Sequence, residues 1–456
     1  MKIVKTYGVF VTTLIIIVVA IVLRLYFYGD PRLSVAMNDT QSYIDSSRAP
    51  VFSWASITGR RLFTMNLVYN IFVNNTRCHL SSISHPAAVQ EANLKLQYCF
   101  DRIAFLQNLL SILGWSFLAL ELSSHIKTPL YKILITIIVL SFALSPQIAE
   151  WDSVLSSESL TLSLFAICFA LMIEIAFQLF GDRNRNQSTI YFLLAGWLIV
   201  FGLWVFVQDA NLYFVPITLL LLLPVIIKGR AKQKALLITF FYLVGVFAIG
   251  LIASAQSTRW QPSIEHSYER YIFPNSSGIN FIKEFGAPDL NAPSFPQWFN
   301  KRAPSVYLLF LASHPGFVVS NVLEYMPMFT ADFLQPYFIA QNTSLSSALL
   351  SLGEVFHPET GGVYLVDTLL LAFMCYTAVD KKERMTRIWT WIGIWIFVSS
   401  VAMLFIRYFG DTAGVLRHIF PAVEFLRLLL WILLIVQADL LAIRGNEITS
   451  LKKKLE

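Results

Sequence analysis

The sequence predicts an all-α membrane protein that crosses the bilayer several times. Its 456 residues are 56% hydrophobic and only 14% charged, whereas soluble domains carry about 25% charged residues. The mean hydropathy is +0.62, and the apolar residues gather in runs that approach the roughly 20 residues a spanning helix needs. The net charge of +6 points to no nucleic-acid partner, because the basic residues cluster in short loops and tails, as membrane orientation requires.

The apolar runs predict about ten spans, within a range of about 10 to 12. They occupy 7–26, 103–123, 129–147, 156–180, 190–207, 211–228, 234–256, 363–379, 387–407 and 417–443. The first run could be a signal peptide, since Lys2 and Lys5 precede it. Because Arg24-Leu25-Tyr26 offers no small-residue cleavage site, we expect a retained anchor instead.

The basic residues predict the topology. They fall on alternate connections: Lys2 and Lys5, Lys127 and Lys132, Arg183 and Arg185, 228–234, 380–387 and 444–454. The positive-inside bias places these connections and both termini in the cytoplasm. The other connections are then outside, at 27–102, 148–155, 208–210, 257–362 and 408–416. We expect a multi-pass protein of the plasma (inner) membrane, although an organelle membrane would give the same signals.

Three regions follow from this topology. They are a transmembrane module over 1–256 that includes the outside loop 27–102, an extracytoplasmic loop over 257–362, and C-terminal spans with a basic tail over 363–456. We expect the outside loops to carry short interfacial helices. One of them, 305–323, is broken at His314-Pro315-Gly316 and predicts a re-entrant or interfacial helix pair.

Four cysteines divide into two kinds. Cys78 and Cys99 both lie in the first outside loop, where an oxidising compartment would favour a disulfide between them. Cys168 and Cys375 lie in apolar runs and are expected in the core.

The outside ends of the predicted spans carry ionisable residues. They are Asp39 and Asp45 after the first span, Glu150, Asp152 and Glu158 in 147–165, Asp209 in the tight turn 208–214, and Arg407, Asp411, Arg417, His418, Glu424 and Arg427 in 407–427. Taken singly, most are explained as helix caps, as solvated charges or as an i,i+3 pair. Charges at membrane depth, however, cost several kcal/mol and usually line a cavity. Glu158 and the face from Arg417 to Arg427 therefore predict such a cavity.

Carboxylates on early outside loops and arginines on the last span favour a site for a lipid-linked phosphosugar. A carboxylate can take a proton from a hydroxyl or amine acceptor, and a guanidinium binds phosphate through two N–H groups. The spacing of Glu150 and Asp152 adds a shared Mg²⁺ or Mn²⁺ ion, because both metals prefer oxygen ligands. The polyprenyl tail would lie in the bilayer and the sugar in the outside cavity.

This arrangement resembles the GT-C superfamily of polytopic membrane glycosyltransferases, which includes protein O-mannosyltransferases, aminoarabinose transferases and oligosaccharyltransferases. The resemblance rests on "NDTQSY" (38–43) in the first outside loop, on "SPQIAEWDSVLSSESLTLSLF" (145–165), and on the order of elements over most of the chain. It implies that Asp39 is the catalytic base, and that Glu150 and Asp152 occupy the place where oligosaccharyltransferases hold metal-binding acids.

Two departures from the family pattern limit what is carried over. The segment "GRRLFTMNLVYN" (59–70) is similar to an Arg-Pro-Pro-x-Tyr-Pro motif of bacterial members but lacks its prolines, and no soluble domain follows the last span. The second departure argues against a sequon-reading oligosaccharyltransferase. By position and chemistry, we expect Arg417 to bind the donor phosphate, with Arg407 second. The full expected set of substrate-binding residues is Glu158, Asp209, Arg407, Arg417, His418 and Arg427.

We therefore expect an inverting glycosyltransferase that moves a sugar from a polyprenyl-phosphate donor to a lipid, glycan or protein acceptor outside. Two alternatives stay open. A polysaccharide polymerase or ligase with a lipid-pyrophosphate donor would need a large basic outside loop, and 257–362 supplies several basic residues. A transporter or flippase would also hold charges in a cavity, but the sequence shows neither inverted repeats nor broken mid-membrane helices.

Overall fold

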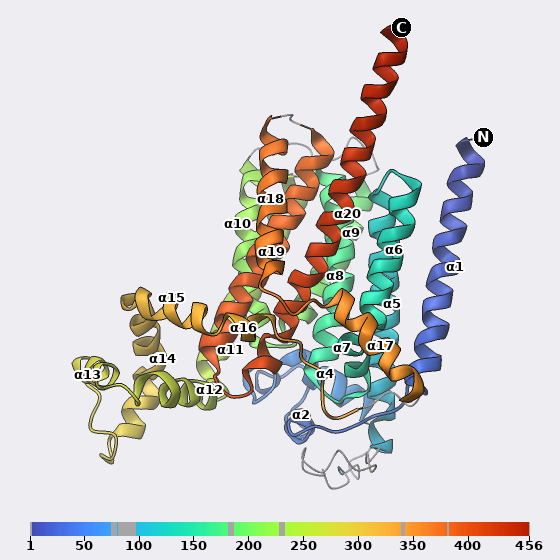
Figure 1. The fold of residues 1–456 in the computed structure, drawn as a ribbon. Coiled ribbons are helices and arrows are strands. Elements are labelled where there is room, and N and C mark those ends of the chain that lie inside the picture. Colours follow the sequence, from blue (N-terminus) through green and yellow to red (C-terminus); the bar gives the residue numbers. More distant parts are fainter. Residues whose placement is uncertain are drawn as a thin grey trace.

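The computed structural model describes residues 2–73, 80, 97–180, 187–227, 233–338, 343–380 and 383–455. Within these ranges the chain is helical, and its strand-like pairing is one isolated bridge between Val35 and Val154. Both termini lie at one end of a helix bundle, and the short helices lie at the other (Figure 1). We call the latter the loop end. The shared end of the termini agrees with the predicted topology, while the side of the membrane that each end faces stays a prediction.

In the described part of the chain, nine helices are long and apolar enough to span a bilayer. They are α1 (Lys2–Tyr28), α5 (Asp101–His125), α8 (Ser157–Phe180), α9 (Gln187–Val205), α10 (Phe214–Ile227), α11 (Gln233–Gln256), α18 (Gly362–Asp380), α19 (Arg384–Gly410) and α20 (Val415–Leu455). The remaining predicted span is α6 (Pro129–Leu144), which a 56° bend separates from 146–153. The bend follows from Pro146, since a proline disfavours helical backbone in the residue before it.

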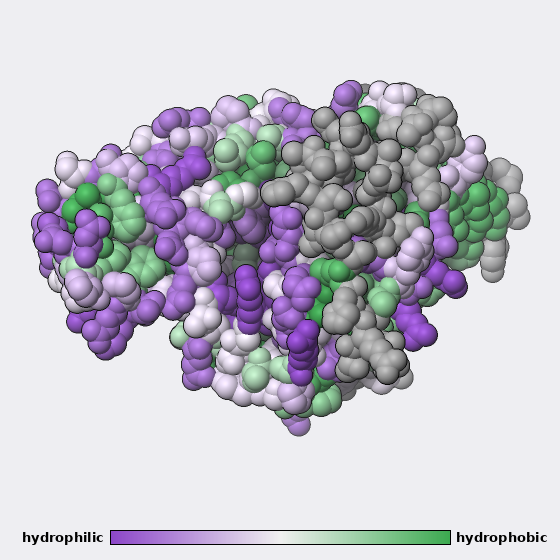
Figure 2. Space-filling model, turned by 90° about the horizontal axis from the view of Figure 1, so that it is seen from below, coloured by the Kyte–Doolittle hydropathy of each residue, from purple (hydrophilic) through white to green (hydrophobic). Residues whose placement is uncertain are grey.

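Short helices cover the loop end. They are α2 (Thr40–Ser46), α3 (Ala55–Thr58), α4 (Phe63–Phe72), η2 (Tyr98–Phe100), α7 (Pro146–Ala149), η3 (Glu150–Ser153), η4 (Asp209–Tyr213), α16 (Met326–Thr330) and α17 (Thr343–Phe356). Seen from this end, the described residues present a mainly hydrophilic surface (Figure 2). Cys99 is disulfide-bonded, whereas Cys168 and Cys375 are free thiols. Cys78, the partner that we predicted for Cys99, lies outside the described residues.

The centre of the bundle is formed by α8 and α20. The most apolar windows of these helices are 89% and 83% buried, against 17% for α1. A helix that is hydrophobic all round is buried on every side, and most residues of α8 are apolar and buried. Because both central helices begin at the loop end (Figure 1), their first residues meet where the short helices cover the bundle.

A lateral lobe, residues 260–324, projects beside the bundle at the loop end (Figure 1). It contains α12 (Trp260–Ser267), η5 (Tyr268–Ile272), α13 (Ser276–Glu284), α14 (Phe295–Ser313) and α15 (Pro315–Glu324). Its own apolar cluster takes in residues of α19 and α20. The predicted break at His314 is confirmed, because α14 and α15 meet there at 84°.

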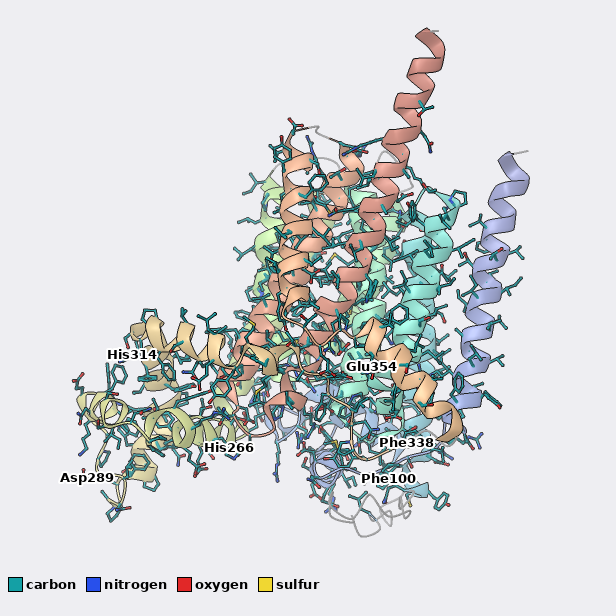
Figure 3. The ribbon with its side chains drawn as sticks, viewed as in Figure 1. Phe100, His266, Asp289, His314, Phe338 and Glu354 are labelled. Carbon is teal, nitrogen blue, oxygen red and sulfur yellow. The ribbon has the colours of Figure 1, made fainter. Side chains whose placement is uncertain are left out.

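The lobe exposes apolar side chains where α14 meets α15. His314 lies toward the level of the bundle and Asp289 lies at the opposite edge (Figure 3). Along α14, Lys301 precedes the exposed Leu308, and α15 buries none of its residues. The α14–α15 corner therefore presents exposed apolar side chains on the side of the spans.

Candidate active site

Backbone hydrogen bonds bring the loop that follows α1 onto the start of α8. Val35 donates to the Ser153 carbonyl at 2.8 Å, and Leu155 donates back to the Val35 carbonyl at 2.9 Å. The Thr40 hydroxyl adds a bond to the Leu155 carbonyl at 3.0 Å. This pairing holds the residue before α2, Asp39, beside the first turn of α8.

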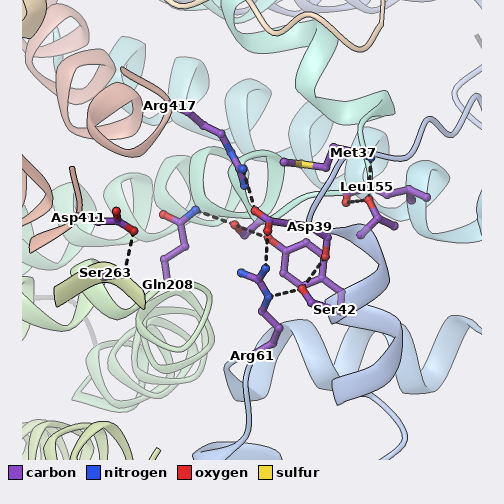
Figure 4. Close-up of polar contacts among 12 residues, drawn as sticks. Met37, Asp39, Ser42, Arg61, Leu155, Gln208, Ser263, Asp411 and Arg417 are labelled. Atoms are coloured by element: carbon purple, nitrogen blue, oxygen red, sulfur yellow. Dashed lines mark hydrogen bonds and ion pairs between the residues drawn. The ribbon is translucent and has the colours of Figure 1, made fainter. Parts of the chain in front are cut away.

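Asp39 lies between two guanidinium groups, as Figure 4 shows. Arg417 donates from Nη1 to Asp39 Oδ2 at 2.8 Å and from Nε to Glu158 Oε1 at 2.7 Å. Arg61 Nη2 lies 2.8 Å from Asp39 Oδ1. We refer to Asp39, Arg61, Glu158 and Arg417 as the Asp39 cluster. The cluster joins the loop that follows α1 to the first turns of α8 and α20.

Arg61 is a member that sequence reasoning missed. Its Nε donates to the Ser42 hydroxyl at 2.6 Å, and its guanidinium lies 4.4 Å from the ring centroid of Tyr43. The Tyr43 hydroxyl in turn lies 3.2 Å from Ser157 Oγ. The signal that could have found Arg61 was the basic pair in "GRRLF", which we compared with a family motif only for its missing prolines.

The cluster keeps Asp39 ionised. Burial alone would raise the pKa of Asp39, but the charges and hydrogen bonds of Arg61 and Arg417 outweigh burial and bring this pKa below the usual 3.8. Burial, reinforced by the charge of Glu158, raises the pKa of Tyr43, so its phenol stays protonated. The Asp39 side chain is 32% exposed and that of Glu158 only 2%. Asp39 is thus the carboxylate that a molecule in solution can reach.

Arg407 adds a buried positive charge beside the cluster. It donates to the Gln208 side-chain oxygen, to Asn211 Oδ1 at 3.3 Å and to the His418 carbonyl. Gln208 links Arg407 to the start of α8, because its Nε2 donates to Ser157 Oγ at 2.7 Å. These partners are all uncharged. Counted with Arg407, the site holds three arginines and two carboxylates, which leaves one positive charge.

The first turn of α20 has an unusual feature at Arg417. Pro421 lies inside the helix, four residues further along. A proline has no N–H, so it donates no helical hydrogen bond to the carbonyl of the residue four positions earlier. That residue is Arg417.

No protein-family model matches the chain, and no curated protein matches it. Among solved structures, it is similar to the archaeal oligosaccharyltransferase AglB from Archaeoglobus fulgidus in complex with an inhibitory peptide and a dolichol-phosphate, at 12% identity and a TM-score of 0.43. That match covers 92% of this chain and 50% of the other. The oligosaccharyltransferase of the same organism in complex with Zn and sulfate gives 12% identity, a TM-score of 0.44 and coverages of 95% and 50%. The chain spans about half the length of these proteins, and at this similarity their activity is not transferred to it.

Other predicted site residues lie away from Asp39 or serve as links. Asp209 forms an ion pair with Arg259 at 2.9 Å, and its side chain is 49% exposed. His418 lies 3.7 Å from Asp411, which also accepts a hydrogen bond from Ser263 of α12 at 2.8 Å. The Asp411 contacts tie the lateral lobe to the start of α20.

Arg427 belongs to a second, deeper network. It lies ten residues after Arg417, about 15 Å along the helix. It is buried, pairs with Glu424 at 2.6 Å, and approaches Asp332 at 3.3 Å. Glu424 also contacts His357. The predicted Glu424–Arg427 pair is therefore present.

The two acids predicted to hold a metal face different partners. Asp152 forms a buried ion pair with Arg24 and accepts a hydrogen bond from Ser159, whereas Glu150 accepts one from Gln335 at 2.8 Å. They lie in a 3₁₀ turn, where three residues complete one turn, so positions i and i+2 point in different directions. A guanidinium already neutralises Asp152, and the residues present do not fit a shared divalent cation.

Among the described residues, a group of side chains that could hold a metal ion occurs away from Glu150 and Asp152. Ligand atoms of Glu121, His125 and Glu174 lie within 4.8 Å of one another. His125 ends α5 and Glu174 lies late in α8, so this group is at the end of the bundle opposite to Asp39. A divalent cation at the active site stays a prediction.

Proposed function

We propose that the chain is an inverting membrane glycosyltransferase of the GT-C type. It transfers a sugar from a polyprenyl-phosphate donor to a lipid, glycan or protein acceptor at the outer face of a plasma membrane. The observation that carries the proposal is the position of Asp39: a reachable carboxylate held between Arg61 and Arg417 at the loop end of the two central helices.

The charge of the site suits a phosphodiester. Three arginines against two carboxylates leave one positive charge, and α8 and α20 both begin here, where helix N-termini attract anions. A polyprenyl-phosphate sugar carries a single negative charge and would neutralise the site. A lipid-pyrophosphate sugar carries two negative charges and would leave an excess of one, which disfavours the polymerase or ligase alternative.

The chemistry needs one base and no general acid. The acceptor hydroxyl attacks the anomeric carbon, a new carbon–oxygen bond forms there, and Asp39 takes the hydroxyl proton. The bond from the anomeric carbon to the phosphate oxygen breaks, and the polyprenyl phosphate leaves with both electrons of that bond. Arg417 and Arg407 stabilise the charge that develops on the leaving oxygen. Holding donor and acceptor together supplies further acceleration.

A transporter is less compatible with the packing below the site. Phe165 of α8 stacks on Phe425 of α20 with ring centroids 3.6 Å apart, and Trp204 and Trp395 lie against the same rings. All four side chains are buried. The aromatic layer fills the space between the central helices, and the deeper charges around Arg427 are already paired with each other.

The test is release of polyprenyl phosphate by purified protein supplied with polyprenyl-phosphate sugars. We expect Asp39→Asn to slow release by about 10²–10⁴-fold, the usual contribution of a positioned base. Asp45→Asn is the matched control, because Asp45 lies in α2, the helix that Asp39 precedes, is exposed, and pairs with the exposed Arg48 at 3.3 Å. Full turnover by Asp39→Asn, or equal losses in both folded variants, would remove Asp39 from the mechanism.

A further inference from the structure

We infer that the donor phosphate itself releases Asp39, by taking Arg417 away from that carboxylate, so that a usable base exists only after the donor has bound. The inference rests on the proposed function and adds an order to it: donor first, acceptor second. Three features of the Asp39 cluster support it, namely how Arg417 is shared, how unequally its two partners are buried, and what holds Asp39 on its other side.

Arg417 has no free edge for a phosphate. A guanidinium binds phosphate bidentately along one of two edges, either through both terminal nitrogens or through Nε and one terminal nitrogen. Nη1 of Arg417 already donates to Asp39 and Nε already donates to Glu158. Each edge thus includes a nitrogen in use, so a phosphate that binds bidentately competes with one of the two carboxylates.

Burial decides which carboxylate gives way. The Glu158 side chain is 2% exposed and that of Asp39 is 32% exposed. A buried carboxylate that loses its cation is strongly destabilised, because neither water nor another charge replaces the lost partner. Asp39 would instead face water and keep Arg61 on Oδ1 at 2.8 Å. The phosphate therefore takes the terminal edge of Arg417, and Asp39 Oδ2 becomes free.

Freed Oδ2 is a better proton acceptor than the resting carboxylate. In the resting cluster, two guanidinium groups hold the pKa of Asp39 low against the effect of burial, and Oδ2 is occupied by Arg417. With the phosphate bound, one of the two cations is neutralised and that oxygen faces the cavity. Arg61, supported by Ser42 and the Tyr43 ring, keeps the carboxylate in place. Glu158 is thus a positioning residue that anchors Arg417 while its other partner changes.

Carbodiimide labelling of Asp39 tests the exchange without an acceptor. Carbodiimides react with protonated carboxyl groups, so the pH at which Asp39 is half labelled, read by mass spectrometry, reports its protonation. The probe is farnesyl methyl phosphate, a phosphodiester with a single negative charge, added to the full-length protein. Removing one nearby opposite charge raises a carboxyl pKa by about 1–3 units. We expect the Asp39 midpoint to rise by about one unit or more with the probe, and the Asp45 midpoint to stay unchanged.

Variants and a separate binding measurement make each outcome decisive. In Arg417→Gln, the midpoint should already be raised and the probe should add nothing. In Arg61→Gln, the starting midpoint should be higher and the probe should still raise it. If equilibrium dialysis shows probe binding that depends on Arg417 while the Asp39 midpoint stays fixed, the exchange is wrong and the phosphate site stands. If the probe does not bind the wild-type protein, the phosphate site of the proposed function fails as well.

Discussion

Replacing Arg24 by Met should leave the Asp152 carboxylate buried in the bundle without a positively charged partner. Arg24 pairs with Asp152 through Nη2 and donates from Nη1 to the Ala143 carbonyl at 3.1 Å, and neither side chain of the pair is more than 7% exposed. Removing one partner of a buried ion pair costs about 3–5 kcal/mol. At about 1.36 kcal/mol per factor of ten, that is more than a 100-fold loss in the folding equilibrium constant.

A double-mutant cycle isolates the interaction energy between Arg24 and Asp152. In Arg24→Met/Asp152→Asn no buried charge is left without a partner, and the new amide can still form a hydrogen bond with Ser159. We therefore expect the double variant to recover most of the lost stability. The assay is equilibrium unfolding in mixed SDS micelles, followed by far-ultraviolet circular dichroism.

Arg48→Met is the matched control for this cycle. Arg48 forms an exposed i,i+3 pair with Asp45, and such pairs contribute about 0–1 kcal/mol. If Arg24→Met costs no more than Arg48→Met, or if the single effects simply add in the double variant, Arg24 does not neutralise Asp152. A metal at Glu150 and Asp152 would then regain support.

Three further outcomes are expected. Because the pKa of Asp39 lies below 3.8, kcat/KM for donor turnover should be flat above about pH 5 and fall only as the pH drops through this low pKa. Arg61→Gln should shift that fall to higher pH, and an unchanged pH profile would contradict the Arg61–Asp39 ion pair. Dialysis against EDTA tests the predicted divalent cation. Because Arg24 already neutralises Asp152, we expect Glu150 and Asp152 to hold no ion that turnover needs, and loss of turnover that Mg²⁺ or Mn²⁺ restores would refute this. A nitroxide attached at Leu308 or Leu323 in nanodiscs should be more accessible to dissolved oxygen than to a water-soluble nickel complex, whereas a nitroxide at Asp289 should be more accessible to the nickel complex. Access of the nickel complex to all three positions would place the α14–α15 corner in water.

The spans were predictable because burial of apolar backbone in a bilayer admits few solutions. A spanning segment must satisfy its own backbone hydrogen bonds as a helix, so each long apolar run predicts a membrane-spanning helix. The described helices follow these runs. The exception is α6, where Pro146 ends the helix inside the predicted span. Pro146 stands in the sequence, but the apolar residues around it favoured one continuous span.

The site was predictable in part. Asp39, Glu158 and Arg417 each lie at the loop end of a span, so their sequence positions alone brought them to one level of the membrane. Arg61 could not be placed in this way, because it lies in an irregular loop whose path is set by tertiary contacts. Arg24 was noted only for its effect on signal cleavage. Its pairing with Asp152 depends on how α1 packs on its neighbours, which no local pattern encodes.

The proline inside α20 separates two mechanical roles in one helix. The helix is 41 residues long, about 60 Å, and most of it is a stiff rod fixed in the centre of the bundle. Pro421 leaves the Arg417 carbonyl without its helical hydrogen bond, so the first turn of α20 is held by one bond fewer than the helix below it. The turn that carries Arg417 can therefore adjust more easily than the rest of α20 when this side chain exchanges a carboxylate for a phosphate. The stacked and buried rings of Phe165 and Phe425 lie further along the helix and need not move.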